Sequence, residues 1–288
     1  MDGTHPCCTC RKRIGADIVR IATFNLWNSD TMRERRIEAI CHEMKQVDAD
    51  IVALQEVWMH GSCGVVDWIA TNCGYAHTVY RQYPDDQNEG LAFMSKRPIA
   101  SVSTIWDSVP EKQIAIRAVI KLPHSKVAVT NVHLDWSSAL TRENEIVELE
   151  RWLSAQYSSD TYEVLCGDFN GDADSSVHRF LTGRQSLGNR ATLWTDVAEY
   201  YADKRQKSSS ITLDFYHHPR WSGVANIEIP MRCDWILLKQ DYPNPSPVIQ
   251  TVRTFGTAPS GTTGVFPSDH YGVALDTDFP ATPTQSDK

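Results

Sequence analysis

Apolar and polar positions alternate along the chain in short runs that are typical of β-strands, with helical spacing between some of them. The first two strand patterns cover residues 17–27 and 49–58. Between them, apolar residues recur at i, i+3, i+4 and i+7 over residues 37–44, which predicts an amphipathic helix with Ser29 or Asp30 as its cap. The beginning of the chain therefore predicts a strand–helix–strand unit.

Similar patterns fill the rest of the chain. Strands are expected at residues 76–80, 90–95, 99–106, 113–122, 126–134, 162–170, 233–239 and 271–279, and helices from residue 141 and at 175–183 and 193–204. The segment 204–230 is polar and is broken by Pro219 and Gly223. It predicts a long loop, and long loops in compact domains are often functional.

No linker divides these elements, so they predict one α/β domain with mixed sheets and helices outside them. We expect this domain to span residues 17–280, after a flexible segment of residues 1–16 and before a disordered tail of residues 281–288. The cysteines near the N-terminus could bind zinc together with His5, or could carry a lipid, but a frayed terminus is the simpler interpretation.

Composition narrows the class of protein. The 288 residues are 41% hydrophobic and include nine tryptophans, which supports a sizeable core and argues against disorder. The net charge of −8 disfavours a protein that depends on non-specific DNA binding, because phosphate contacts supply most of that affinity. Neither a membrane-spanning run nor a secretory signal is visible, so we expect a reduced, cytoplasmic setting, and we expect a monomer.

Several predicted strands end or begin with a polar residue that a strand does not need. These residues are Asn25, Glu56, His133, Asp168, Asn170, Asp234, Asp269 and His270. Each one alone has a structural explanation, such as a turn or a hydrogen-bonded buried polar group. Together they favour a metal site, because neighbouring carboxylates are costly to bury without a cation. Oxygen ligands select Mg²⁺, Mn²⁺ or Ca²⁺, and a site with open water positions suits Mg²⁺ holding a phosphate.

These residues lie in segments that resemble a known family. Seven segments occur in the order expected of the endonuclease/exonuclease/phosphatase superfamily of deoxyribonuclease-like metal-dependent phosphoesterases: ATFNLW, LQEVW, GLAFMSKRPI, NVHLDW, LCGDFNGDADS, RCDWILL and PSDHYGV. The resemblance covers residues 18–279 and is strongest to uncharacterised bacterial members, with neutral sphingomyelinases more distant. It implies a four-layer α/β/β/α sandwich, with two mixed sheets packed face to face, and a Mg²⁺- or Mn²⁺-dependent phosphoric ester hydrolase.

The resemblance also implies which residues bind the metal and the phosphate. Glu56 resembles the principal metal ligand, Asn25 contacts the metal or the phosphate beside it, and Asp269 lies near the metal. Asn170 resembles the amide that steadies the phosphate. Trp27 stands where some nucleases of the superfamily carry a second acid, so a second metal on that side is not implied.

The remaining matched residues resemble groups that move or hold protons. Asp168 resembles the acid that orients or activates the attacking water. Asp234 and His270 resemble a hydrogen-bonded pair in which the carboxylate fixes the tautomer of the imidazole. His133 resembles the histidine that contacts the scissile phosphate or protonates the leaving oxygen.

Three functions remain open. The acidic balance favours hydrolysis of a small-molecule or lipid-derived phosphodiester or monoester, with aromatic residues near Tyr83 and Trp221 at the rim of the site. A Mg²⁺-dependent nuclease acting on DNA or RNA is the alternative, with phosphate contacts from Lys204, Arg205, Lys207 and, later in the chain, Arg220, although a solvated basic cluster is the simpler interpretation of these residues. A non-catalytic binding module is the third, although such a protein is expected to have lost acids that are present here.

Overall fold

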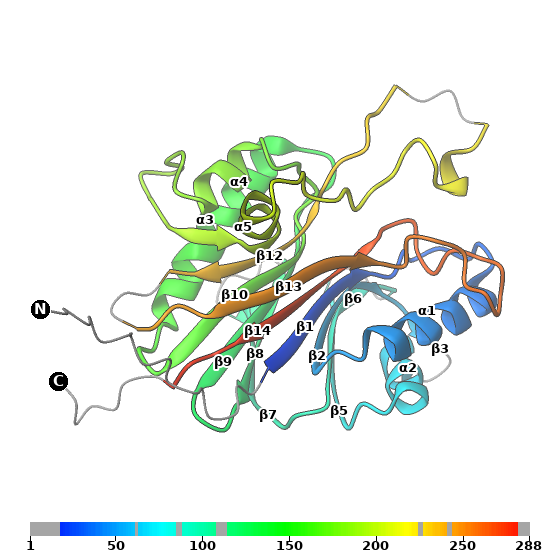
Figure 1. The fold of residues 1–288 in the computed structure, drawn as a ribbon, viewed down its shortest axis with the longest axis horizontal. Helices are drawn as coiled ribbons and strands as arrows, with labels where there is room; N and C mark the ends of the chain where they lie inside the picture. Colours follow the sequence, from blue (N-terminus) through cyan, green and yellow to red (C-terminus); the bar gives the residue numbers. More distant parts are fainter. Residues whose placement is uncertain are drawn as a thin grey trace, which may run out of the picture.

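Two β-sheets form the centre of the molecule (Figure 1). The computed structural model describes residues 18–60, 63–84, 88–107, 114–223, 227–240 and 244–281. Residues 1–16, which were predicted to be flexible, and residues 282–288 of the predicted disordered tail lie outside the described residues, and so does the N-terminal cysteine cluster.

Within the described residues, each of the two sheets has six strands and is mixed. The first sheet contains, in spatial order, β13 (Val248–Phe255), β14 (Gly272–Asp278), β1 (Ile18–Asn25), β2 (Ile51–Val57), β6 (Gly90–Ser95) and β5 (His77–Gln82). The second contains β11 (Trp194–Asp196), β12 (Asp234–Lys239), β10 (Thr161–Asp168), β9 (Lys126–His133), β8 (Ala115–Lys121) and β7 (Ile99–Thr104). A short hairpin of β3 (Met59–His60) and β4 (Cys63–Gly64) follows β2.

Helices cover the outer faces of the two sheets. Figure 1 shows α1 (Arg33–Val47) and α2 (Val65–Cys73) beside the first sheet, and α3 (Ala139–Ala155), α4 (Ser176–Leu181) and α5 (Val197–Lys204) beside the second. Two short 3₁₀ turns, η1 (Ile105–Asp107) and η2 (Pro219–Trp221), lie in connections. This arrangement is the predicted four-layer α/β/β/α sandwich.

Three apolar clusters hold the layers together. One lies between the sheets and includes Ile21, Phe93 and Ile236. The other two lie between each sheet and its helices, with Ile40 of α1 in one and Leu149 of α3 in the other. The predicted apolar stripe of α1 is therefore the face that the helix buries. In the described part of the chain, no helix combines the length and the apolar character that a membrane crossing requires.

Some predicted element boundaries are wrong. Helix α1 has no side-chain cap, because the left-handed Met32 precedes it and the predicted cap Asp30 instead forms an ion pair with Arg33. The predicted helix at 193–204 begins only at Val197, because Asp196 ends β11 and caps α5 by accepting from two backbone N–H groups. The sequence patterns did not identify β13 or α2.

The strand directions bring one end of both sheets together. Strands β1 and β2 are parallel, and so are β9 and β10, so their carboxyl ends lie at the same end of each sheet. Strands β12 and β14 are antiparallel to β10 and β1, so they begin at that end. The carboxyl ends of β1, β2, β9 and β10 therefore lie near the amino ends of β12 and β14.

Candidate active site

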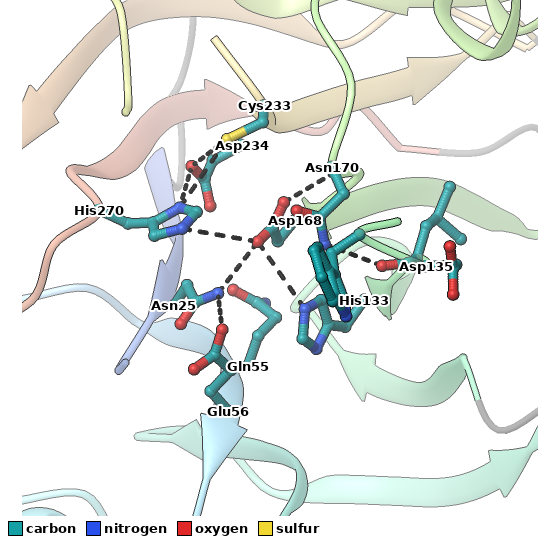
Figure 2. Close-up of polar contacts among 12 residues, drawn as sticks. Asn25, Gln55, Glu56, His133, Asp135, Asp168, Asn170, Cys233, Asp234 and His270 are labelled. Carbon is teal, nitrogen blue, oxygen red and sulfur yellow. Dashed lines mark hydrogen bonds and ion pairs between the residues drawn. The ribbon is translucent and has the colours of Figure 1, made fainter. Parts of the chain in front are cut away.

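Asp168 lies at the centre of this end of the molecule (Figure 2). It is the last residue of β10 and is 1% exposed. Its Oδ2 atom accepts a hydrogen bond from Asn25 at 3.0 Å and lies 3.8 Å from Nε2 of His270 and 3.9 Å from Nε2 of His133. Gly167 allows this position, because its φ is +141° and a Cβ there would collide with the carbonyl oxygen of Val132 on β9. One carboxylate oxygen thus joins residues from both sheets.

Backbone geometry marks the same region. Glu56, Trp27 and Asn170 are non-glycine residues with positive φ, at 51°, 56° and 47°. The left-handed conformation is unfavourable for residues with a Cβ and persists where the surroundings impose it. At Glu56 the left-handed conformation coincides with a shift in the register between β2 and β6, which interrupts the regular pairing of β2 at this residue. This local strain is a reason, independent of the sequence motifs, to regard the region as functional.

Asn25 and Glu56 form the side of the site that comes from the first sheet. The Asn25 amide donates to Glu56 Oε1 at 3.0 Å, and its own Oδ1 accepts from the backbone N–H of Trp27 at 2.9 Å. The second oxygen of Glu56 accepts from the backbone N–H of Asn28 at 2.7 Å. Asn25 therefore links Glu56 to Asp168, and the predicted metal ligand lies beside the predicted water-orienting acid.

Asp234 and His270 are in contact, as the sequence analysis expected. The first residue of β12 accepts from His270 Nδ1 at 3.0 Å, and both side chains are buried. Burial lowers the pKa of His270, but the charges of Asp234 and Asp168 outweigh burial and raise the pKa well above that of free imidazole. With Nδ1 on Asp234, the Nε2 atom faces Asp168 (Figure 2). The structure thus directs one nitrogen of the imidazole into the site, and the neighbouring carboxylates favour the protonated form of the ring.

His133 and Asn170 complete the set from the second sheet. His133 ends β9 directly opposite Asp168 in the register of the two strands. The backbone N–H of Asn170 donates to Asp168 Oδ1 at 2.8 Å, and its amide donates to the carbonyl of Leu134 at 2.8 Å. The backbone and the side chain of Asn170 are therefore both hydrogen-bonded, which fixes the turn after Asp168.

Asp269 is the predicted site residue for which no direct contact with the others is recorded among the described residues. It is 1% exposed, and its carboxylate forms an ion pair with Arg220 of η2. The charge of Glu56 acts on the same arginine, because it opposes the lowering of the Arg220 pKa that burial causes. Arg220 thus lies between the two predicted acidic metal ligands.

Sequence reasoning missed several residues that shape the site. Glu89 precedes β6 and lies 3.8 Å from His133, and the rule that residues before antiparallel strands reach this end would have found it. Arg36 is 1% exposed on α1 and donates to the carbonyls of Leu26, Trp27, Ser29 and Pro267, which fixes the segments before and after the site. Burial lowers its pKa to about 10, so it stays charged at neutral pH.

Tyr83 and Cys233 lie close to the site residues. Tyr83, an expected rim residue, packs edge to face on Trp106 with ring centroids 6.2 Å apart, and burial together with the charges of Glu89, Glu56 and Asp168 raises its pKa. Cys233 is buried, and its Sγ lies 3.8 Å from Nδ1 of His270 and 3.5 Å from Oδ2 of Asp234. Burial raises the pKa of the Cys233 thiol, which keeps it neutral.

The donor set fits a divalent cation. Glu56, Asp168 and Asp234 bring three carboxylates to one region, and the buried Oδ1 of Asp234 has no hydrogen-bond partner among the residues that the structure describes. A buried carboxylate oxygen without a partner is costly, and a cation would satisfy it.

Comparison with known proteins agrees with this geometry. The family model described as Endonuclease/Exonuclease/phosphatase family matches residues 22–270. A search of curated proteins found no match. Members of this family are generally metal-dependent hydrolases of phosphoesters.

Solved structures share the fold. The D. rerio TDP2 structure in complex with a single strand DNA product has a TM-score of 0.70 and 18% identity, over 91% of this chain and 99% of that chain. An endonuclease/exonuclease/phosphatase from Bacteroides vulgatus has a TM-score of 0.69 and 18% identity, over 91% and 99%. A family protein from Leptotrichia buccalis has a TM-score of 0.67 and 16% identity, over 91% and 100%.

At these identities the structural likeness shows the fold, while the family match extends over most of the sequence and includes Asn25, Glu56, Asp168 and His270. The sandwich architecture and the meeting of polar strand ends agree with both findings. This chain is a member of the endonuclease/exonuclease/phosphatase family.

Proposed function

We propose that this protein is a Mg²⁺- or Mn²⁺-dependent phosphoesterase that hydrolyses a phosphate ester by in-line attack of an activated water. One observation carries the proposal. Asp168 Oδ2 is contacted or approached by Asn25, His133 and His270, which come from three different strand ends. A structural role alone does not require acids and histidines to converge at a single oxygen between two sheets.

Each residue has a task in this proposal. Glu56, with Asn25 and Asp269, would hold the cation, which when bound neutralises charge on the phosphate. Asp168 orients or activates the water, because its Oδ2 lies where Asn25, His133 and His270 converge. His270, held by Asp234, places a positive N–H beside the phosphate as charge develops. We assign phosphate binding to Asn170, and phosphate contact or protonation of the leaving oxygen to His133.

We propose a small-molecule or lipid-derived phosphoester as the substrate. The net charge of −8 works against a long polyanion, whose affinity depends on many basic contacts. Apolar side chains near the segment that leads into β12 are strongly exposed, with Tyr216 at 64% and Ile229 at 66%. His218 of the same segment contacts the Ser268 carbonyl, next to Asp269, so exposed apolar side chains on this segment are suited to a substrate with an apolar portion.

A screen of phosphoester classes with Mg²⁺ and with Mn²⁺ tests the proposal. Turnover should require one of these ions and should stop in excess EDTA. Asp168→Asn should lower the rate by on the order of 10²-fold or more, because it removes the charge that orients water. The matched control is Asp160→Asn, an exposed acid that precedes β10 at its opposite end and pairs with Lys126. Full activity in EDTA contradicts the metal-dependent mechanism.

A nuclease is the second candidate, and one observation favours it. A cavity of about 210 Å³ beside α5 is lined by Arg205, Lys207, Arg232 and Arg253, so two of the four expected basic residues do gather near other arginines. Nucleic-acid binding through such contacts weakens steeply as salt concentration rises. A steep dependence of oligonucleotide affinity on salt, lost in a combined Arg205→Gln and Lys207→Gln variant, would favour this candidate.

A further inference from the structure

Arg220 reaches the site from outside the sheets. It belongs to η2, in the long segment between α5 and β12 that extends away from the sandwich in Figure 1. Its guanidinium pairs with Asp269 and lies over two indole rings, 5.0 Å from the centroid of Trp27 and 4.3 Å from that of Trp221. Contacts with a buried carboxylate and two aromatic faces specify one position for this side chain.

The segment that carries Arg220 is fastened to the site. His218 is 4% exposed, and its ring contacts the Ser268 carbonyl through Nε2 at 3.0 Å, just before Asp269. The backbone N–H of Arg220 donates to Nδ1 of the same ring at 3.2 Å. Nearby, Leu213 forms a β-bridge with His270. The segment of residues 213–221, here called the strap, is therefore fixed to the site by hydrogen bonds, and it holds Arg220 in place.

The charges of the site give this arginine a task. Four carboxylates, those of Glu56, Asp168, Asp234 and Asp269, surround the place where an anionic ester would react. Arg220 brings a guanidinium to this group by pairing with Asp269, so it offsets part of the negative charge that would repel an anionic ester. An anion enters a neutral site more readily than a negative one.

We propose that Arg220 is a substrate-binding residue whose guanidinium donates to a non-bridging oxygen of the substrate phosphate; this inference rests on the function proposed above. A guanidinium has five N–H donors in a fixed fork, so a pair with Asp269 leaves donors for a second anion. The Arg220 side chain is 37% exposed, which leaves part of it accessible to a ligand. Trp27 and Trp221 both contact the guanidinium and so restrict its position beside Asp269.

Binding of inorganic phosphate to the Mn²⁺-saturated protein, measured by calorimetry, tests this role without turnover. In Arg220→Gln the dissociation constant for phosphate should rise about tenfold or more, because a charge-assisted hydrogen bond is lost. Arg220→Lys should lose less, since it keeps the charge and not the fork. Arg151→Gln is the matched control, because Arg151 is exposed on α3 and pairs with Glu148. Circular dichroism should show that all variants are folded.

Measurements of Mn²⁺ affinity and of turnover distinguish phosphate binding by Arg220 from a role in metal binding. The dissociation constant for Mn²⁺ should stay the same or fall in Arg220→Gln, because the arginine and the cation compete for Asp269. Equal phosphate affinity in wild type and Arg220→Gln, or no phosphate binding by wild type, overturns the inference. If no phosphoester is hydrolysed but the variant still loses phosphate affinity, the proposed function fails while the role of Arg220 stands.

Discussion

At the scale of single residues, the contact between Asp234 and His270 makes a quantitative prediction. The 3.0 Å hydrogen bond keeps the imidazole protonated and directed at Asp168, so neither residue can do its work alone. Asp234→Asn and His270→Ala should each reduce kcat by on the order of 10²-fold, and the double variant should be little worse than either. Rates of the four proteins on one phosphoester complete the cycle. If the increases in activation free energy of the two single variants add up to that of the double variant, the two residues act independently and the prediction is wrong.

Residue identities could be predicted where an ionisable side chain follows an apolar run. Asn25, Glu56 and Asp168 stand out in this way, because each is a polar residue at the end of a strand pattern. Arg36 could not be found, because it looks like an ordinary helix residue, and Arg220 stood out only as a basic residue of a possible nucleic-acid patch, with nothing in the sequence to link it to Asp269. What distinguishes them is burial and long-range contact, and neither is visible in local spacing.

At the scale of elements, the strap around His218 predicts a pH dependence. Burial lowers the pKa of His218 to about 4, whereas an unfolded histidine titrates near pH 6.5. Between these values the unfolded chain binds a proton that the folded protein does not, so stability falls as pH falls. From pH 7.5 to pH 5.0 the loss attributable to His218 should be about 2 kcal/mol. Urea unfolding of wild type and His218→Gln at both pH values measures it.

The variant should lose less stability on acidification than wild type, because it keeps a polar side chain and removes the titrating group. His77→Gln on β5 is a control for the loss of a histidine far from the strap. Parallel pH profiles for wild type and His218→Gln would contradict the prediction.

The elements themselves were predictable to different degrees for a physical reason. Strands buried on both faces, such as β2, leave a continuous apolar run that local sequence reveals. Strand β13 at the edge of the first sheet alternates weakly and carries Thr251 and Arg253, which pair with Asp276 of β14. Such an edge depends on partners distant in sequence, so its pattern alone does not predict a strand.

At the scale of the whole molecule, the site joins the two sheets, so ion binding should stabilise the fold. Glu56 comes from the first sheet and Asp168 from the second, with Asn25 hydrogen-bonded to both. In the absence of a cation their carboxylates repel one another, and an ion that binds only the folded state adds about 2.7 kcal/mol at a concentration of 100 times its Kd. For a domain of this size, that corresponds to a rise in Tm of about 5–10 °C.

Thermal unfolding with and without Mn²⁺ therefore measures the coupling between the site and the sandwich. Wild type and Asp160→Asn should show the rise, and EDTA should reverse it, because Asp160 pairs with Lys126 far from the site. Glu56→Gln should show little or none, since a neutral amide is a weaker ligand than a carboxylate. In the absence of the ion, Asp168→Asn should melt no lower than wild type, because one of the repelling charges is gone. An undiminished rise in Glu56→Gln would place the bound ion elsewhere on the chain and separate metal binding from this end of the two sheets.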